Sequence, residues 1–225
     1  RNASLYENLD SMFLGTLQSM VAAIDAKDPY TRGHSQRVAV LSRDLATAIG
    51  LPESFVRTAH LAGLVHDIGK IGVPEAVLCK AGRLDEEEFA QIRQHPQTGY
   101  RILKDIPQIR ELLPGVLCHH EAWNGSGYPA GLAEEEIPLL ARIVAICDSF
   151  DAMSSSRTYR KAMPRDEVFR EIRSCSDRLY DPRIVPVFLG MDFTEYDRLL
   201  ERESAAVGHE RFEQRLGGDF PRRAA

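Results

Sequence analysis

Apolar residues recur at intervals of three and four along most of this chain of 225 residues. The two clearest stripes consist of Val38, Leu41, Leu45 and Ile49, and of Phe55, Ala59, Ala62 and His66. This spacing places the side chains of each stripe on one face of an α-helix. No segment shows the alternation of apolar and polar residues that is typical of a strand, and the sequence contains no internal repeat. The sequence therefore predicts an all-α fold, a multi-helix bundle around one core.

Turn-forming residues divide the chain into three parts. Residues 1–27 are a predicted helix that ends at Asp28-Pro29. Its predicted apolar stripe consists of Leu5, Leu9, Phe13, Leu17, Met20, Val21 and Ile24. This helix either packs on the core or continues upstream as a connector from a missing domain. Residues 28–190 hold the main domain, and residues 191–225 hold a C-terminal helix and a tail. The helices expected after residue 27 cover 34–49, 53–66, a segment from 85 towards 95, 109–117, 140–148, 165–178, 183–190 and 194–206, with a loop over 121–138.

Composition excludes several classes of function. A net charge of −5 and an isoelectric point near 5.8 argue against binding to a nucleic acid backbone. No stretch approaches the ~20 apolar residues of a membrane span, and no signal-peptide pattern follows Arg1. The four cysteines form no Cys-x-x-Cys pair, which indicates reduced thiols. We therefore expect a cytoplasmic fragment of a longer protein, with no DNA or RNA partner and no membrane contact of its own, whose parent could be tethered to a membrane upstream.

Histidines and aspartates gather in short clusters that suit a transition metal. Two of the clusters are adjacent pairs, within the runs HDIGK and HHEAWNGSGYP. The complete candidate set consists of His34, His66, Asp67, His95, His119, His120 and Asp148. Imidazole and carboxylate together suit iron, manganese, zinc or nickel. Because such ions activate water and bind phosphate oxygens, the sequence favours a metallohydrolase.

Seven protein ligands exceed what one ion usually takes. We therefore expect two ions, roughly 3.5–4 Å apart, that share a bridging carboxylate. Asp67 is the natural bridge, because it neighbours a ligand and offers two oxygens. The two predicted ligand sets are His34, His66, Asp67 and Asp148 for one ion, and His95, His119 and His120 for the other.

Each residue also has a purely structural interpretation. Taken singly, His34 on an apolar face resembles a core histidine, His95 resembles a loop residue and Asp148 resembles a helix cap. A metal site is favoured because the candidate residues occur together, and five of the seven histidines fall into one pattern. The two others, His60 and His209, are expected to be structural or surface residues.

Six runs of sequence together resemble the HD-GYP domain, a bacterial subgroup of the HD phosphohydrolase superfamily. They are DPYTRGHSQRVA (28–39), HDIGKIGVPEAVLCKAGRL (66–84), HPQTGYRIL (95–103), HHEAWNGSGYPAGL (119–132), IPLLARIVAICDSFDAMSSSRTYRKAM (137–163) and YDPRIVPVFL (180–189). Their order and gaps fit the family, and the resemblance covers residues 28–190. It implies an HD-type helical bundle with a metal centre in its core. It also implies hydrolysis of cyclic di-GMP to linear pGpG and, in some members, to GMP.

The resemblance also implies roles for single residues. The family's metal ligands fall on the same seven residues that the chemistry selects, and catalytic roles fall on Asp67 and Lys70. The implied substrate contacts are Lys70, Arg157, Arg160, Gly127, Tyr128 and Pro129. Of these, the two arginines match a phosphate-binding basic pair, and the last three residues are the GYP signature.

The chain departs from the family pattern at three positions. Members with a third metal have a Glu four residues before the first ligand His, where this chain has Tyr30. We therefore expect two divalent transition-metal ions, with iron or manganese preferred and zinc or nickel as alternatives. Ala81 replaces the usual Pro after Lys80, and Asp177 stands where the family often has Gly. Both positions lie away from the predicted ligands.

Two other functions stay open at this point. A general HD-type nucleotide phosphohydrolase would need only the first ligand set. A catalytically silent module would bind cyclic di-GMP or a protein and relay a signal. The partners implied are cyclic di-GMP and another signalling protein, such as a diguanylate cyclase, with this domain as the output of a bacterial signalling protein. The apolar stripe of residues 1–27 is compatible with a homodimer, and Trp123 either stacks on guanine or anchors its loop.

Overall fold

The computed structural model describes residues 2–27, 33–80, 82–155, 162–203 and 205. The chain divides into two compact units, Arg1–Met191 and Asp192–Ala225. The helices of the first unit are α1 (Asn2–Lys27), α2 (His34–Ile49), α3 (Glu53–Val65), η1 (Ile68–Gly72), α4 (Glu75–Leu78), α5 (Glu86–Ile92), α6 (His95–Leu103), η2 (Pro107–Leu112), α7 (Leu113–Cys118), η3 (Glu134–Glu136), α8 (Leu139–Ser154), α9 (Arg165–Ser174) and α10 (Ile184–Leu189).

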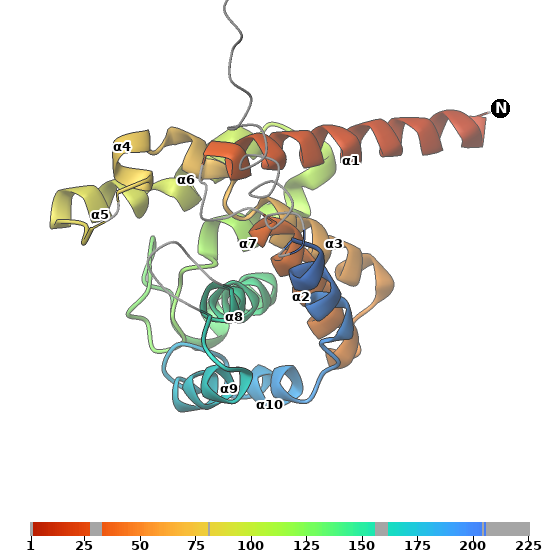
Figure 1. Ribbon diagram of the computed structural model, residues 1–225. Coiled ribbons are helices and arrows are strands. Elements are labelled where there is room, and N and C mark those ends of the chain that lie inside the picture. Colours follow the sequence, from red (N-terminus) through yellow and green to blue (C-terminus); the bar gives the residue numbers. More distant parts are fainter. Residues whose placement is uncertain (1, 28–32, 81, 156–161, 204, 206–225) are drawn as a thin grey trace, which may run out of the picture. The chain divides into compact units, whose positions relative to one another are not determined.

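Helices supply the regular structure throughout the described part of the chain (Figure 1). There the nearest approach to a strand is an isolated bridge between Ser176 and Tyr180. The predicted all-α class is confirmed. Helix α9 ends before its predicted end, because the chain turns at Asp177, whose φ is 63°, and the Asp177 N–H donates to the Tyr180 carbonyl. A left-handed conformation favours Gly, which accounts for the residue that the HD-GYP pattern often has at this position.

The core of the first unit is built around α8, which packs against α2, α3, α7 and α9 (Figure 1). The buried apolar residues of α8 are Leu140, Ala141, Ile143, Val144, Ile146, Cys147 and Phe150. Helices α2 and α3 also pack against each other and are joined by the short turn at Gly50–Pro52. Because α8 is apolar around most of its circumference, it takes the central place that the hydrophobic effect gives to such a helix.

Helix α1 covers this core with a narrower stripe than the sequence predicted. Leu17, Val21 and Ile24 are buried, whereas Met20 is 46% exposed. At 100° per residue Met20 lies at the edge of that stripe. Including Met20 in the core face was therefore wrong. The side chains of the first three predicted stripe positions, Leu5, Leu9 and Phe13, lie outside the described residues.

The second unit contains a helix over residues 194–203. The Asp192 carboxylate accepts hydrogen bonds from the Thr194 N–H and hydroxyl, at 2.9 and 2.6 Å. Such a side chain just before the first turn satisfies backbone donors that have no partner within the helix. The helix expected over 194–206 is therefore present across its described residues.

Several chain segments of the first unit meet at one place. Helix α6 packs against η1 and α7, and α2, α3 and α8 pack together. The start of α2, the end of α3 and the middle of α8 are thereby brought towards the start of α6 and the end of α7. A backbone contact tightens this arrangement, because a Cβ on Gly69 would lie 1.8 Å from the His95 carbonyl oxygen. Glycine at this position therefore lets η1 and α6 touch.

Candidate metal centre

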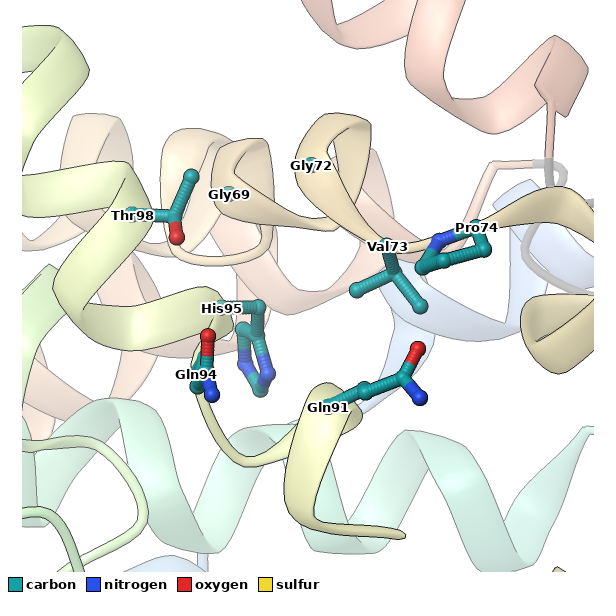
Figure 2. A pocket seen from close by; sticks show the side chains of 8 residues that line it. All are labelled: Gly69, Gly72, Val73, Pro74, Gln91, Gln94, His95 and Thr98. Atoms are coloured by element: carbon teal, nitrogen blue, oxygen red, sulfur yellow. The ribbon is translucent and has the colours of Figure 1, made fainter. Parts of the chain in front are cut away.

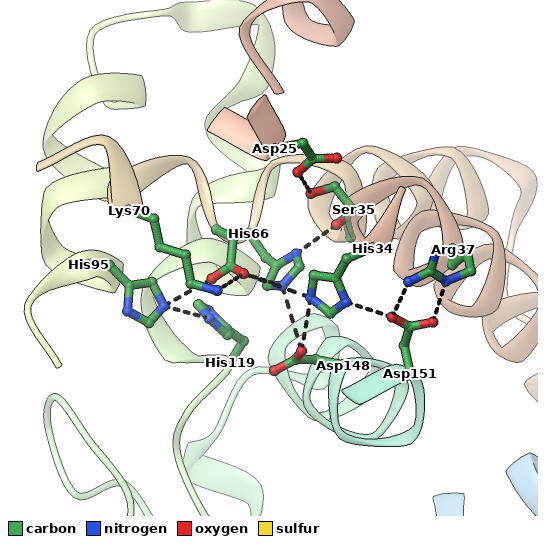
Figure 3. A network of polar contacts seen from close by, with 12 residues as sticks. Asp25, His34, Ser35, Arg37, His66, Lys70, His95, His119, Asp148 and Asp151 are labelled. Atoms are coloured by element: carbon green, nitrogen blue, oxygen red, sulfur yellow. Dashed lines mark hydrogen bonds and ion pairs between the residues drawn. The ribbon is translucent and has the colours of Figure 1, made fainter. Parts of the chain in front are cut away.

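The seven predicted ligands come together at this meeting point. Figure 3 labels His34, His66, His95, His119 and Asp148 among them. His34 is the first residue of α2, and His95 is the first residue of α6. The other five are His66 and Asp67 between α3 and η1, His119 and His120 directly after α7, and Asp148 within α8. Residues up to 114 positions apart in sequence thus surround one small volume.

Two triads can be distinguished within the cluster. The first triad consists of His34, His66 and Asp148, and the second triad consists of His95, His119 and His120. In each triad one ligand atom per residue lies within 4.8 Å of the corresponding atoms of the others. A third such group joins His66, Asp67 and His119, so Asp67 lies between the two triads. Apart from Asp67, which was predicted in the first set, this division follows the two predicted ligand sets.

Backbone carbonyls fix the tautomer of three of the histidines. The Nδ1 atoms of His66, His95 and His119 lie 2.7, 2.7 and 2.9 Å from the carbonyl oxygens of Gly63, Ile92 and Val116. A carbonyl can only accept, so each Nδ1 carries the proton and donates it. Each Nε2 is then left with a lone pair, as a metal-ligating histidine requires.

These lone pairs converge in a way that fits a cation. The Nε2 atoms of His95 and His119 lie 3.2 Å apart, although neither needs to carry a proton. The Nε2 atom of His66 is buried and has no hydrogen-bond partner within the described chain. Buried polar atoms without partners are costly, and two facing lone pairs repel each other. One metal ion at His66 and a second ion between His95 and His119 would satisfy these nitrogens, so this donor set fits the predicted cofactor.

The Asp67 carboxylate faces both triads. Its Oδ1 lies 3.2 Å from His95 Nε2, while its Oδ2 lies 3.4 Å from His66 Nε2 and 3.7 Å from His34 Nε2. The same Oδ2 accepts from Lys70 Nζ at 2.6 Å. One oxygen towards each triad is the arrangement that a bridging carboxylate needs.

His34 is supported by two residues that the sequence analysis missed. Its Nδ1 lies 2.7 Å from Asp151 Oδ2, and Arg37 donates to both oxygens of Asp151 at 2.6 and 2.9 Å. All three side chains are buried, and Figure 3 shows them in a row behind the first triad. A signal was available, since Arg37 and Asp151 each stand three residues after a predicted ligand and so share its helix face.

Charge gathers on the first triad and on Asp67. Burial alone would lower the pKa of His34, but the hydrogen bonds that its ring donates to Asp148 and Asp151 raise it to about 9. Burial opposes ionisation of Asp148, yet its contact with His34 holds the pKa of this carboxyl far below its usual range. Burial likewise opposes ionisation of Asp67, while Lys70 and His66 hold its pKa well below the usual value. Both carboxylates are therefore ionised at neutral pH.

The second triad lacks such carboxylates. Burial, together with the neighbouring imidazoles of His120 and His66, holds the pKa of His119 well below its usual range. Burial also lowers the pKa of His120 to about 4. Both rings are therefore neutral at pH 7, which is the protonation state in which imidazole binds a metal.

The loop that follows His120 folds back onto the second triad. The Glu121 carboxylate accepts from the Ala130 and Leu132 N–H groups at 2.7 and 3.1 Å and so closes the loop. A Cβ on Gly127 would lie 2.2 Å from the Ala122 nitrogen, so this position requires glycine. The Tyr128 ring stacks on His120 with centroids 4.8 Å apart. The GYP sequence therefore packs against a candidate ligand.

Other residues from the sequence analysis lie around the centre or beyond the described chain. Lys70 is mostly buried beside Asp67. Trp123 is buried, with the guanidinium groups of Arg142 and Arg183 over its ring at 5.8 and 5.4 Å, so it anchors its loop. The residues that lie outside the described part are Tyr30, Ala81, Arg157 and Arg160.

This fold and site define a helical domain of the class that holds metals through histidine and aspartate. Over residues 18–184 the chain matches the HD domain family, and it belongs to that family. It is 46% identical over 168 residues to a cyclic di-GMP phosphodiesterase of Thermotoga maritima, covering 74% of this chain and 46% of that protein. It is 38% identical over 175 residues to 3'3'-cGAMP-specific phosphodiesterase 3 of Vibrio cholerae, covering 77% of this chain and 38% of that protein.

The fold is also found among solved structures. The HDG"Y"P protein Bd1817 of Bdellovibrio bacteriovorus superposes with a TM-score of 0.58 at 22% identity, over 69% of this chain and 50% of that one. The chain spans about half the length, or less, of the curated relatives that it matches. Among the helices of the described residues, none has the length and apolar character to cross a membrane.

Proposed function

We propose that this chain is the catalytic part of a metal-dependent phosphodiesterase that hydrolyses cyclic di-GMP to pGpG, with GMP as a further product. The observation that carries the proposal is the pair of triads on either side of the Asp67 carboxylate. The name of the Thermotoga maritima relative supports the choice of substrate. A one-metal phosphohydrolase would leave the second triad, with its facing Nε2 atoms, without a purpose.

The proposed cofactor is a pair of divalent ions, iron or manganese, with zinc or nickel as alternatives. The first triad would hold one ion, the second triad the other, and Asp67 both. When bound, such ions lower the pKa of a shared water and stabilise negative charge on phosphate oxygens. The donor set supports iron or manganese, because it combines imidazole with carboxylate and contains no thiolate.

The protein's own residues would orient the substrate. Lys70, whose Nζ lies 2.6 Å from Asp67, stands where it can donate a hydrogen bond to the scissile phosphate. Arg157 and Arg160 are proposed to hold phosphate through their forked donors. Gly127, Tyr128 and Pro129 would border the substrate on the side of the second triad, where Tyr128 covers His120.

We also propose a location, a parent protein and partners for the domain. The substrate and the four unbridged cysteines support a cytoplasmic location. We further propose that the domain is the output of a longer signalling protein, with other signalling proteins as partners and with dimerisation through α1. The test of these points is the oligomeric state of the full-length protein measured with and without residues 1–27.

The activity can be tested by metal analysis of anaerobically purified protein together with chromatography of its products from cyclic di-GMP. We expect two metals per chain and the appearance of pGpG. A matched control is His60→Gln, which changes a histidine of α3 outside the cluster and should leave both readouts unchanged. Protein loaded with two metals that forms neither pGpG nor GMP would refute the proposal and favour a silent binding module.

A further inference from the structure

A cavity of about 220 Å³ lies beside the second triad and shares His95 with it (Figure 2). One wall is formed by η1 and the turn after it, from Gly69 to Pro74. The opposite wall carries Gln91 at the end of α5, Gln94 before α6 and Thr98 within α6. Nothing in the proposed reaction uses these three side chains.

The lining is polar, and among the described residues that form it His95 alone has an ionisable side chain. Gln91 and Gln94 each offer an amide, which donates through nitrogen and accepts through oxygen. Figure 2 shows the two amides on either side of the His95 ring, with Val73 and Pro74 across from Gln91. Within the described part of the chain neither amide has a hydrogen-bond partner. Both are therefore available to a ligand.

The polar groups that line the cavity suit the base of a nucleotide better than its phosphate. A phosphate favours cationic donors, and among the residues that the structure describes, Lys or Arg does not line the cavity. A purine base instead presents donors and acceptors along one edge, which a carboxamide can match with two hydrogen bonds at once. The volume is below the roughly 300–1,000 Å³ of pockets that bury a whole drug-sized ligand. The cavity thus suits one base rather than a dinucleotide.

We propose that this cavity binds a purine base of the nucleotide whose phosphate lies at the metal centre, with Gln91 and Gln94 as specificity-determining residues. The shared residue His95 places the two subsites next to each other, as a base and its own phosphate require. The inference rests on the proposed function, because the base is that of the cyclic dinucleotide. A carboxamide can pair with guanine or with adenine, so these positions would govern which purine is preferred.

The first test uses isothermal titration of manganese-loaded protein with GMP and with ribose 5-phosphate, which lacks the base. We expect GMP to bind about tenfold more tightly, as two net hydrogen bonds of ordinary strength predict. In Gln91→Met/Gln94→Met, which keeps the length of both side chains, GMP should bind within about twofold of ribose 5-phosphate. The matched control is Gln97→Met, an exposed residue of α6 outside the cavity, which should keep the preference for GMP.

The outcomes separate the base site from the proposed function. If the double variant keeps the tenfold preference for GMP, the base site is overturned, whether or not cyclic di-GMP is hydrolysed. If that preference depends on the two glutamines but no cyclic di-GMP is hydrolysed, the base site stands and the proposed function fails. Hydrolysis adds a second criterion. The ratio of kcat/KM for cyclic di-GMP to that for 3'3'-cGAMP should change in the double variant, and an unchanged ratio also overturns the base site.

Discussion

The two triads have similar burial but opposite surroundings. The first triad includes the carboxylate of Asp148, and its His34 is backed by the buried Asp151–Arg37 pair. The second triad consists of three imidazoles, two of which are oriented by backbone carbonyls, and its His120 is covered by Tyr128 of a loop. The first triad takes Asp148 from within α8 and its histidines from the start of α2 and the end of α3, whereas all three residues of the second triad lie at the start of α6 or just after α7.

This difference indicates which triad should bind its metal ion more tightly. An ionised carboxylate attracts a divalent cation directly, and a carboxylate behind a histidine makes that histidine a stronger ligand. Imidazoles backed by uncharged carbonyls bring no negative charge to the site. We therefore expect the first triad to bind its ion more tightly, and a chelator to remove the ion of the second triad first.

The largest expected effect comes from the residue that the triads share. Asp67→Ala removes the carboxylate that faces both triads and that accepts from Lys70. Turnover should fall by more than roughly a hundredfold, beyond the 10–100-fold that loss of a supporting residue costs, and at least one metal should be lost. Metal analysis and product chromatography measure both effects. The control is Asp44→Ala, which removes a partly exposed carboxylate of α2 that pairs with Arg43. If the Asp67→Ala protein keeps two metals, Asp67 does not bridge them.

The second-largest effect is expected for Asp151→Asn, and the loss of metal affinity should be confined to the first triad. Asp151→Asn removes the charge behind His34, so the metal affinity of the first triad should drop about 10–100-fold while the second triad keeps its affinity. Because Arg37 would lose the buried carboxylate to which it donates two hydrogen bonds, the free energy of unfolding should also fall by about 3 kcal/mol. Metal titration and urea denaturation check the two parts. An equal loss of affinity at both triads would show that the triads are not independent.

A third prediction separates the triads by pH. His34, whose pKa is about 9, carries a proton at pH 7, and a metal takes imidazole only in its neutral form. Binding to the first triad therefore displaces one proton, and its affinity should rise about tenfold per pH unit until pH reaches about 9. His119 and His120 are already neutral at pH 7, so the second triad should respond much less. Metal titrations at pH 6, 7 and 8 measure both slopes, and equal slopes would contradict the assignment.

The comparison of the two triads also shows which features could be predicted from the sequence. The helices α2, α3 and α8 could be predicted because their buried faces follow the helical period. Ligand types could be predicted because the chemistry of imidazole and carboxylate is independent of the fold. The residues behind the ligands are different, since Asp151 matters only where α8 lies against the start of α2, and no local pattern fixes that contact. The same holds for Met20, whose exposure depends on how far the neighbouring helices extend.

The ligands of the second triad could be predicted from the sequence, but the residues that pack around them could not. The pair His119-His120 and the GYP signature are visible in the sequence, but the stacking of Tyr128 on His120 depends on how Glu121 closes the loop. The cavity beside His95 depends on the contact of Gly69 with α6. Both features arise from backbone approach between segments, and sequence spacing does not report such distances.

The smallest predicted effect concerns the outer support of the second triad. The Arg93 guanidinium lies 5.1 Å from the centre of the Tyr128 ring and 4.7 Å from that of Phe89, so it links α5 to the loop. An exposed contact of a cation with an aromatic ring contributes about 0.5–1 kcal/mol. Arg93→Ala should therefore lower the metal affinity of the second triad only about two- to fivefold and leave the first triad unchanged. Lys104→Ala, an exposed charge at the end of α6, is the control for loss of positive charge. If both variants weaken the second triad equally, the effect comes from charge alone, and Arg93 does not hold Tyr128 against His120.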